Sequence, residues 1–172
     1  MESFKLKIIF INTGFSENNE VVQGLIGCHF KNNYRLNLGV NVFVKNVETK
    51  SGEIVTLAFW DVCSKPSFKF FLSSLYKGAM GVFGLIKDVR SYEIVRKQID
   101  EIKNITKMDV PYVLVFIDNN ETASLDLNNI KIQVNSEGGT LIKISEAEDR
   151  KVNDAVLELA HKIIASNMIV PN

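Results

Sequence analysis

Short apolar runs recur along the chain, and most are bounded by glycine, proline, asparagine or serine. Runs of four to eight apolar residues with such borders are typical of core strands. Two of the runs are separated by the turn sequence TKSG, which predicts a β-hairpin. The predicted strands are residues 4–11, 39–48, 53–61, 79–86, 112–117 and 140–145.

The segments between these strands carry helical signals. Residues 91–105 place Val95, Ile99 and Ile102 on one face, with charged residues opposite. Residues 66–78 begin with proline and end with glycine, which frames a short helix. The predicted helices are residues 19–30, 66–78, 91–105, 125–139 and 149–165. Strands separated by helices predict an α/β fold, with a six-stranded, mostly parallel sheet, one antiparallel strand and helices on both faces.

Length and composition narrow the class of protein. The chain has 172 residues, which suits a single domain over residues 1–172, and its 20 basic and 20 acidic residues cancel. Cys28 and Cys63 lack CxxC spacing, which is typical of reduced cytosolic thiols. The sequence has no recognisable signal peptide, membrane span or lipidation motif. We therefore expect a cytoplasmic protein with no lipid anchor, membrane span or nucleic-acid partner.

Four stretches resemble motifs of the Ras superfamily of small GTPases, and most of all its Rab branch. Residues 34–45 (YRLNLGVNVFVK) are similar to the switch I motif Y-x-x-T-[IL]-G-V-D-F, and residues 57–81 follow the switch II motif L-x-[IL]-W-D-T-A-G-Q-E. Residues 111–121 occupy the place of P-x-x-L-V-G-N-K-x-D, and residues 141–160 that of E-T-S-A-K and the last helix. Because these matches are collinear, the resemblance implies a Ras-like P-loop G-domain fold over nearly the whole chain.

The resemblance also implies a degenerate phosphate loop. In the family, a strand runs into G-x-x-x-x-G-K-[ST], whose lysine stabilises the phosphates and whose hydroxyl holds Mg²⁺. Asn18 and Asn19 stand at the lysine and hydroxyl positions of this chain. Asn12 and Glu17 replace the two motif glycines, while Gly14 lies elsewhere in the loop. The lysine charge and the glycine backbone that wrap a phosphate are therefore missing.

Residues 16–20 (SENNE) follow at the start of the predicted helix 19–30, where unpaired N–H groups carry a partial positive charge. Two interpretations remain open for them. Their side chains replace the phosphate as caps and counter-charges, or they are ordinary polar loop residues.

The switch motifs are changed as well. Asn37 replaces the switch I threonine that reaches Mg²⁺ and the γ-phosphate, whereas the switch II aspartate is kept as Asp61. Ser64 and Lys65 replace the glycine and the glutamine that follow it in the family. The resemblance therefore implies that the groups which sense γ-phosphate and orient the attacking water are lost.

Guanine recognition is also weakened. The family motif N-K-x-D corresponds to residues 117–120, which read IDNN. Asn120 replaces the aspartate that accepts two N–H bonds from guanine, and an amide offers only one acceptor oxygen. Ser145 alone matches the E-T-S-A-K motif.

These losses predict a pseudo-GTPase, a non-catalytic Rab-like module without a bound cofactor that acts by protein–protein interaction. We expect no catalytic residue and no metal site. One alternative is a divergent small GTPase that still binds GTP or GDP with magnesium as a molecular switch. Another is an α/β domain that takes a different ligand at the carboxyl ends of its strands.

The expected partner surface is the former switch surface, on the hairpin and the helix 66–77. We predict that Phe68, Phe71, Leu72 and Leu75 form the buried stripe of this helix, which leaves Phe70 or Tyr76 partly outside. The resemblance places the hydrophobic effector triad of Rab proteins on Val42, Trp60 and Leu75. The competing interpretation assigns most of these side chains to core packing.

Overall fold

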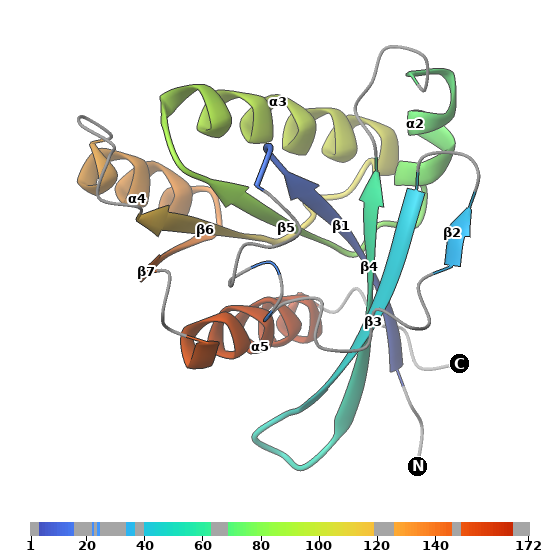
Figure 1. Ribbon diagram of the computed structural model, residues 1–172. Helices are drawn as coiled ribbons and strands as arrows, with labels where there is room; N and C mark the ends of the chain where they lie inside the picture. Colours follow the sequence, from blue (N-terminus) through green and yellow to red (C-terminus); the bar gives the residue numbers. More distant parts are fainter. Residues whose placement is uncertain are drawn as a thin grey trace.

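The computed structural model describes residues 4–15, 22, 24, 34–36, 40–62, 69–118, 126–145 and 149–166 (Figure 1). A seven-stranded sheet lies at the centre, in the order β2-β3-β4-β1-β5-β6-β7. The strands are β1 (Phe4–Asn12), β2 (Tyr34–Leu36), β3 (Val40–Glu48), β4 (Ile54–Val62), β5 (Gly81–Ile86), β6 (Tyr112–Asp118) and β7 (Thr140–Ser145). The helices are α2 (Lys69–Tyr76), α3 (Val89–Thr106), α4 (Leu127–Ser136) and α5 (Asp149–Ala165).

The strand directions confirm the predicted fold class. Strands β4, β1, β5, β6 and β7 pair in parallel, while β3 is antiparallel to both β4 and β2. The predicted hairpin therefore supplies the single strand that runs against the others. The six predicted strands are all present, and β2 adds three residues at the edge of the sheet. Three residues are too few to show a hydrophobic period, which is why the pattern gave no sign of β2.

Strand β1 contributes side chains to two hydrophobic cores, because its side chains alternate between the two faces of the sheet. Leu6, Ile8 and Phe10 are buried beneath α5, in a core that also holds stacked and edge-on phenylalanine rings. Ile9 and Ile11 are buried on the opposite face. Helices α2, α3 and α4 cover that second face, as Figure 1 shows.

The helix boundaries agree with the sequence pattern to within a few residues. Helix α3 begins after Asp88, whose carboxylate accepts from the Ser91 N–H at 2.7 Å while the Ser91 hydroxyl accepts from the Asp88 N–H. This reciprocal pair is a capping box, and it places the start two residues before the predicted one. Most of the predicted helix 19–30 lies outside the described residues, within which Val22 and Gly24 are helical.

A polar cluster ties α3, β6 and the end of α4 together at the edge opposite the carboxyl ends of the strands. The Tyr112 hydroxyl donates to the Glu137 carboxylate at 2.9 Å and accepts from the Arg96 guanidinium at 3.0 Å. Arg96 also forms an ion pair with Glu137. Burial raises the pKa of Glu137, but the hydrogen bonds from Tyr112 and Arg96 outweigh it and the pKa lies below its usual value. These contacts stabilise the fold at a site far from the strand ends.

Within the part of the chain that the structure describes, no helix is long and apolar enough to cross a membrane.

Candidate functional site

The carboxyl ends of the parallel strands meet at one edge of the sheet, which is where open α/β folds bind ligands. Gly14 follows β1, Asp61 lies next to the end of β4 opposite Phe10, and Ser145 ends β7. Neighbouring strands lie about 4.8 Å apart, so Ser145, three strands from β1, is about 14 Å away from that strand. The predicted pocket residues that the structure describes therefore line one edge, spread over its width.

The loop after β1 is closed by a side chain of the strand itself. The Asn12 carboxamide oxygen accepts from the Phe15 N–H at 2.8 Å, and its NH₂ group donates to the Phe15 carbonyl at 3.0 Å. Phosphate-binding loops depend on free backbone N–H groups that point at the anion. The Phe15 N–H is instead bonded within the protein, so a phosphate at this position would have to displace Asn12.

Two further contacts fix the same loop. The Thr13 hydroxyl donates to the Leu85 carbonyl at 2.8 Å, which joins the loop to the end of β5. Gly14 has φ +96°, a left-handed conformation that side chains resist, and this explains the glycine at that position. The Phe15 ring packs on the core beneath α5, and the Lys87 ammonium lies 5.3 Å from its centroid. A comparison of the motif positions alone overlooks the contacts of Thr13 and Phe15, because both residues lie between those positions.

The position of the guanine-recognition motif has structural contacts of its own. Ile117 is fully buried in the core beneath α5, where the family has a polar asparagine. Asp118 forms an ion pair with Lys143 of β7 at 2.7 Å. The first two positions of the motif are thus occupied by a core residue and by an ion pair between neighbouring strands.

Four predicted pocket residues lie outside the described residues, so their assignment to the pocket stays a prediction: Asn18, Asn19, Asn37 and Asn120. Among the described residues, no three His, Cys, Asp or Glu side chains gather as metal ligands do. The described part of the loop fits a triphosphate poorly, because the Asn12 side chain holds the backbone that would have to open.

A second candidate surface lies on the hairpin and α2. Val42 pairs with Trp60 across the hairpin, and Trp60 pairs with Ile9 of β1. Laterally paired residues point to the same side of a sheet, and Ile9 is buried under α2 and α3, so Val42 and Trp60 stand on the α2 side. Both are partly exposed, as is Leu75 of α2.

The exposure of each side chain shows which of the predicted α2 residues lie on the surface and which lie in the core. The Phe70 side chain is 91% exposed, in agreement with its predicted place on the surface. Tyr76 is 2% exposed, so its assignment to the partner surface is wrong. Phe71, assigned to the buried stripe, is 51% exposed, while Leu72 is buried as predicted. The helix is rotated relative to the predicted stripe, so that Leu72 and Tyr76, four residues apart, face α3 and the sheet.

The Tyr76 phenol is enclosed by this packing. Burial, with the nearby Glu101 carboxylate, raises the pKa of Tyr76 to about 12. With 2% of its surface exposed, Tyr76 belongs to the core between α2 and α3.

Lys7, which the sequence pattern did not single out, joins this surface to β1. Its ammonium donates to the Lys77 carbonyl at 2.8 Å, just after the end of α2. It also lies 4.3 Å from the centroid of the Trp60 ring, a cation–π distance. Burial lowers the pKa of Lys7. One side chain thus holds the end of α2 against Trp60.

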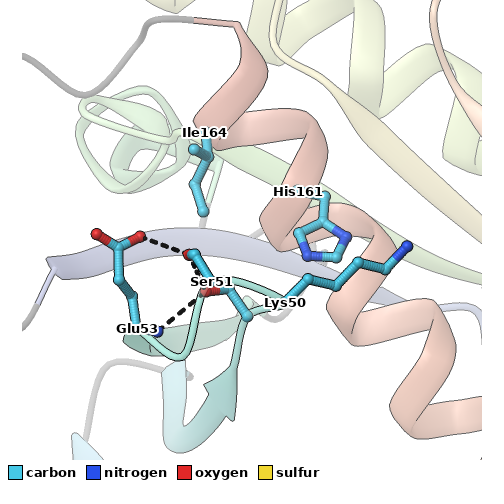
Figure 2. Close-up of a pocket in the computed structure, with 6 residues that line it drawn as sticks. Lys50, Ser51, Glu53, His161 and Ile164 are labelled. Atoms are coloured by element: carbon cyan, nitrogen blue, oxygen red, sulfur yellow. Dashed lines mark hydrogen bonds between the residues drawn. The ribbon is translucent and has the colours of Figure 1, made fainter.

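A pocket of about 320 Å³ lies between the β3–β4 turn and α5 (Figure 2). It is lined by Thr49, Lys50, Ser51, Glu53, His161 and Ile164. The Thr49 hydroxyl accepts from the Glu53 N–H at 3.2 Å, and the Ser51 hydroxyl donates to the Glu53 carboxylate at 3.1 Å. These bonds close the turn of the hairpin, so the polar lining has a structural role.

Residues 7–165 match the model of the Ras family, and the chain belongs to this family. It is 27% identical to the GTP-binding protein YPTM1 of Zea mays over 138 residues, which cover 78% of this chain and 66% of that protein. It is 23% identical to the Ras-related protein RABA6b of Arabidopsis thaliana, over 78% of this chain and 62% of the relative.

The Ras-related protein RabZ of Dictyostelium discoideum is likewise 23% identical, over 72% of this chain and 56% of its own length. The chain thus spans between about half and two-thirds of the length of these relatives. The α/β sheet with its single reversed strand, together with the family match, defines a Ras-like domain similar to Rab proteins.

Proposed function

We propose that this chain is a non-catalytic member of the Ras family, a pseudo-GTPase that acts by binding another protein. The observation that carries the proposal is the pair of hydrogen bonds between the Asn12 side chain and the Phe15 backbone. In a working phosphate loop this position is a glycine without a side chain. In this chain the Asn12 side-chain oxygen accepts the hydrogen bond of the Phe15 N–H. Asn18 also stands where the family has its lysine.

The free energy of the lost contacts favours very weak nucleotide binding. A hydrogen bond to a charged group contributes about 1.5–3 kcal/mol. The changes at Asn18, Asn19, Asn37 and Asn120 remove four such contacts, or about 6–12 kcal/mol in total. That sum corresponds to roughly four to nine orders of magnitude in affinity. At the middle of that range, a nanomolar ancestral site would fall to about the millimolar range. Hydrolysis would also be lost without the lysine and the glutamine.

The alternative is a divergent GTPase that keeps GTP or GDP with magnesium by other contacts. Two observations favour it. One relative, from Zea mays, is described as a GTP-binding protein. The Lys87 ammonium also lies beside the loop, over the Phe15 ring, where it would supply a positive charge in place of the missing lysine.

Nucleotide content separates the two functions. Freshly purified protein is denatured by heat, and the supernatant is resolved by ion-exchange chromatography beside a working Rab protein treated identically. The pseudo-GTPase proposal predicts a trace without a guanine nucleotide peak. A stoichiometric GDP or GTP peak would establish the alternative.

The protein-binding part of the proposal depends on the surface formed by Val42, Trp60, Leu75 and Phe70. Phe70 and Phe71, adjacent on one short helix, are 91% and 51% exposed, and grouped exposed apolar side chains favour an interaction site. Val44 lies two residues after Val42 on the same face of β3, and it is 59% exposed. Exposed aromatic and aliphatic groups are typical of protein-recognition surfaces.

A further inference from the structure

The pocket between the β3–β4 turn and α5 is built by two segments that are far apart in sequence (Figure 2). The turn contributes four lining residues between positions 49 and 53, and α5 contributes His161 and Ile164. His161 and Ile164 are three residues apart, so they lie on the same face of α5. Thr49 is buried and both α5 residues are half-buried. The pocket therefore has walls that the fold itself holds in place.

Hydrogen bonds within the turn use three of the polar side chains of this lining. The Thr49 and Ser51 hydroxyl oxygens lie 2.8 Å apart, and the Ser51 hydroxyl donates to the Glu53 carboxylate at 3.1 Å. Lys50 and His161 take no part in these bonds. Among the described residues, neither of them forms a hydrogen bond or an ion pair. The pocket thus offers an ammonium and an imidazole that the protein does not use itself.

The carboxylates near the pocket are poorly placed to pair with these two groups. Glu53 is the only acidic residue of the lining, and it already accepts a hydrogen bond within the turn. Figure 2 shows its carboxylate at the opposite end of the pocket from His161. On α5, Glu158 is bonded to β7. Asp154 lies seven residues before His161, or about 10 Å along the helix, a separation at which salt screens exposed charges strongly.

The size of the pocket and its apolar wall limit the kind of ligand. Its volume of about 320 Å³ lies at the lower end of the range for small-molecule sites, about 300–1,000 Å³. Ile164 supplies an apolar contact surface on the same helix face as the imidazole. Ammonium and imidazole N–H groups donate charge-assisted hydrogen bonds to carboxylates. These features together favour a small anion that carries a short aliphatic chain.

We propose that this pocket binds a small aliphatic carboxylate, whose oxygens accept from the Lys50 ammonium and the His161 imidazole and whose chain packs on Ile164. Lys50 is exposed on a flexible four-carbon stem, so its ammonium can turn toward the ligand. The bound ligand would join the turn to α5, because its two polar contacts come from the two segments. The site is separate from the loop after β1 and from α2, and it therefore goes beyond the proposed function.

The test is a titration of the isotope-labelled full chain, followed by the backbone amide resonances in its NMR spectrum. Hexanoate is the probe, because it joins one carboxylate to a short aliphatic chain. Acetate and inorganic phosphate keep the anion without the chain, and hexylamine keeps the chain with the opposite charge. We expect hexanoate to shift the resonances of residues 49–53 and 161–164 to saturation, with a Kd of about 1 mM, which is typical of so small a ligand.

The comparison ligands should bind less well for separate reasons. Acetate and phosphate should bind at least about tenfold more weakly than hexanoate, since they lack the CH₂ groups that pack on Ile164. Hexylamine should cause no saturating shift, because its ammonium meets the ammonium of Lys50.

Variants test the two polar contacts. Lys50→Glu should weaken hexanoate binding at least about threefold, because an attractive contact becomes repulsive. His161→Leu removes the N–H donor and keeps an apolar side chain, and it should weaken binding by a similar factor. The matched control Lys131→Glu, an exposed lysine of α4, should change the affinity less than about 1.5-fold. The same spectra show whether each variant is folded.

The outcomes that would overturn the site are distinct from those that bear on nucleotide. Hexanoate that saturates no shift up to about 20 mM, well above the expected Kd, would rule out the pocket as a carboxylate site. Equal binding of hexylamine, acetate or phosphate would contradict the proposed ligand class. Shifts confined to other residues, or a Lys50→Glu variant that binds like the wild type, would contradict the assignment to this pocket. A guanine nucleotide peak in the purified protein would change none of these results.

Discussion

The Asn12 side chain spans the turn to Phe15 with both atoms of its amide, accepting from the Phe15 N–H at 2.8 Å and donating to its carbonyl at 3.0 Å. This relationship closes a loop that, in a nucleotide-binding relative, would stay open around phosphate. The described part of this loop, up to Phe15, is thus closed by the protein's own side chain.

Replacing Asn12 by alanine should destabilise the fold by about 1–3 kcal/mol, because two hydrogen bonds are lost at a partly buried position. Urea unfolding followed by circular dichroism measures the change. Asn128→Ala, an exposed position on α4, is the matched control and should stay within about 0.5 kcal/mol. An Asn12→Ala variant as stable as the wild type would mean that the two bonds do not support the loop.

A charged substitution should leave the stability of the fold nearly unchanged at Phe70 and lower it at Tyr76. Phe70→Glu should leave the free energy of unfolding within about 0.5 kcal/mol, since the side chain is 91% exposed. Tyr76→Glu should cost more than about 3 kcal/mol, because it places a carboxylate in the core between α2 and α3. Thermal unfolding of both variants, with Ile132→Glu as an exposed control, gives the comparison. Unfolding by Phe70→Glu would show that this residue belongs to the core.

Lys7→Met should loosen the end of α2. Methionine keeps much of the apolar stem but loses the bond to the Lys77 carbonyl and the cation–π contact with Trp60. We expect a loss of about 1–2 kcal/mol and a change in Trp60 emission. Lys5→Met, on the same strand and face but exposed, is the control and should change neither signal. Identical spectra for the two variants would contradict the proposed role of Lys7.

Lowering the pH should remove the contribution of the Glu137 carboxylate to the stability of the fold. Its pKa in the fold lies below the ordinary value of 4.5, so its stabilisation is fully present above that pH and is lost as pH falls through the folded pKa. Between pH 7 and about pH 3, the wild type should therefore lose more stability than Glu137→Gln, which has no carboxylate to titrate. Glu93→Gln, an exposed position of α3, should retain the wild-type dependence. Parallel curves for wild type and Glu137→Gln would contradict this linkage.

Hydrophobic periodicity predicted most of the fold because the core strands and helices carry regular patterns. Strand β5 is buried at all six residues, and α3 buries Val95, Ile99 and Ile102 on the expected face. Periodicity failed on α2, which has large apolar side chains on nearly all sides. Two neighbouring stripes are then equally regular, and packing against α3 and the sheet decides between them. That choice buries Tyr76 and exposes Phe71.

The sequence predicts the site as a set of substituted motif positions, since these positions can be compared one by one with the family motif. Contacts between particular residues are harder to predict. Asn12 bonds to a residue three positions later, and Lys7 bonds to the carbonyl of Lys77, which is 70 residues away in sequence. Such contacts depend on the folded loop and on strand β1 lying beside Trp60, and neither is visible in a linear pattern.

The central claim, that this Ras-family domain does not work through guanine nucleotide, is tested most directly by calorimetric titration of the nucleotide-free protein. GTP and GDP are added separately with Mg²⁺, and a working Rab protein serves as the positive control. The account predicts no heat of binding up to about 1 mM nucleotide, and no rise in melting temperature, because ligand that barely exceeds Kd stabilises a protein very little. A dissociation constant in the micromolar range or below for either nucleotide would contradict it.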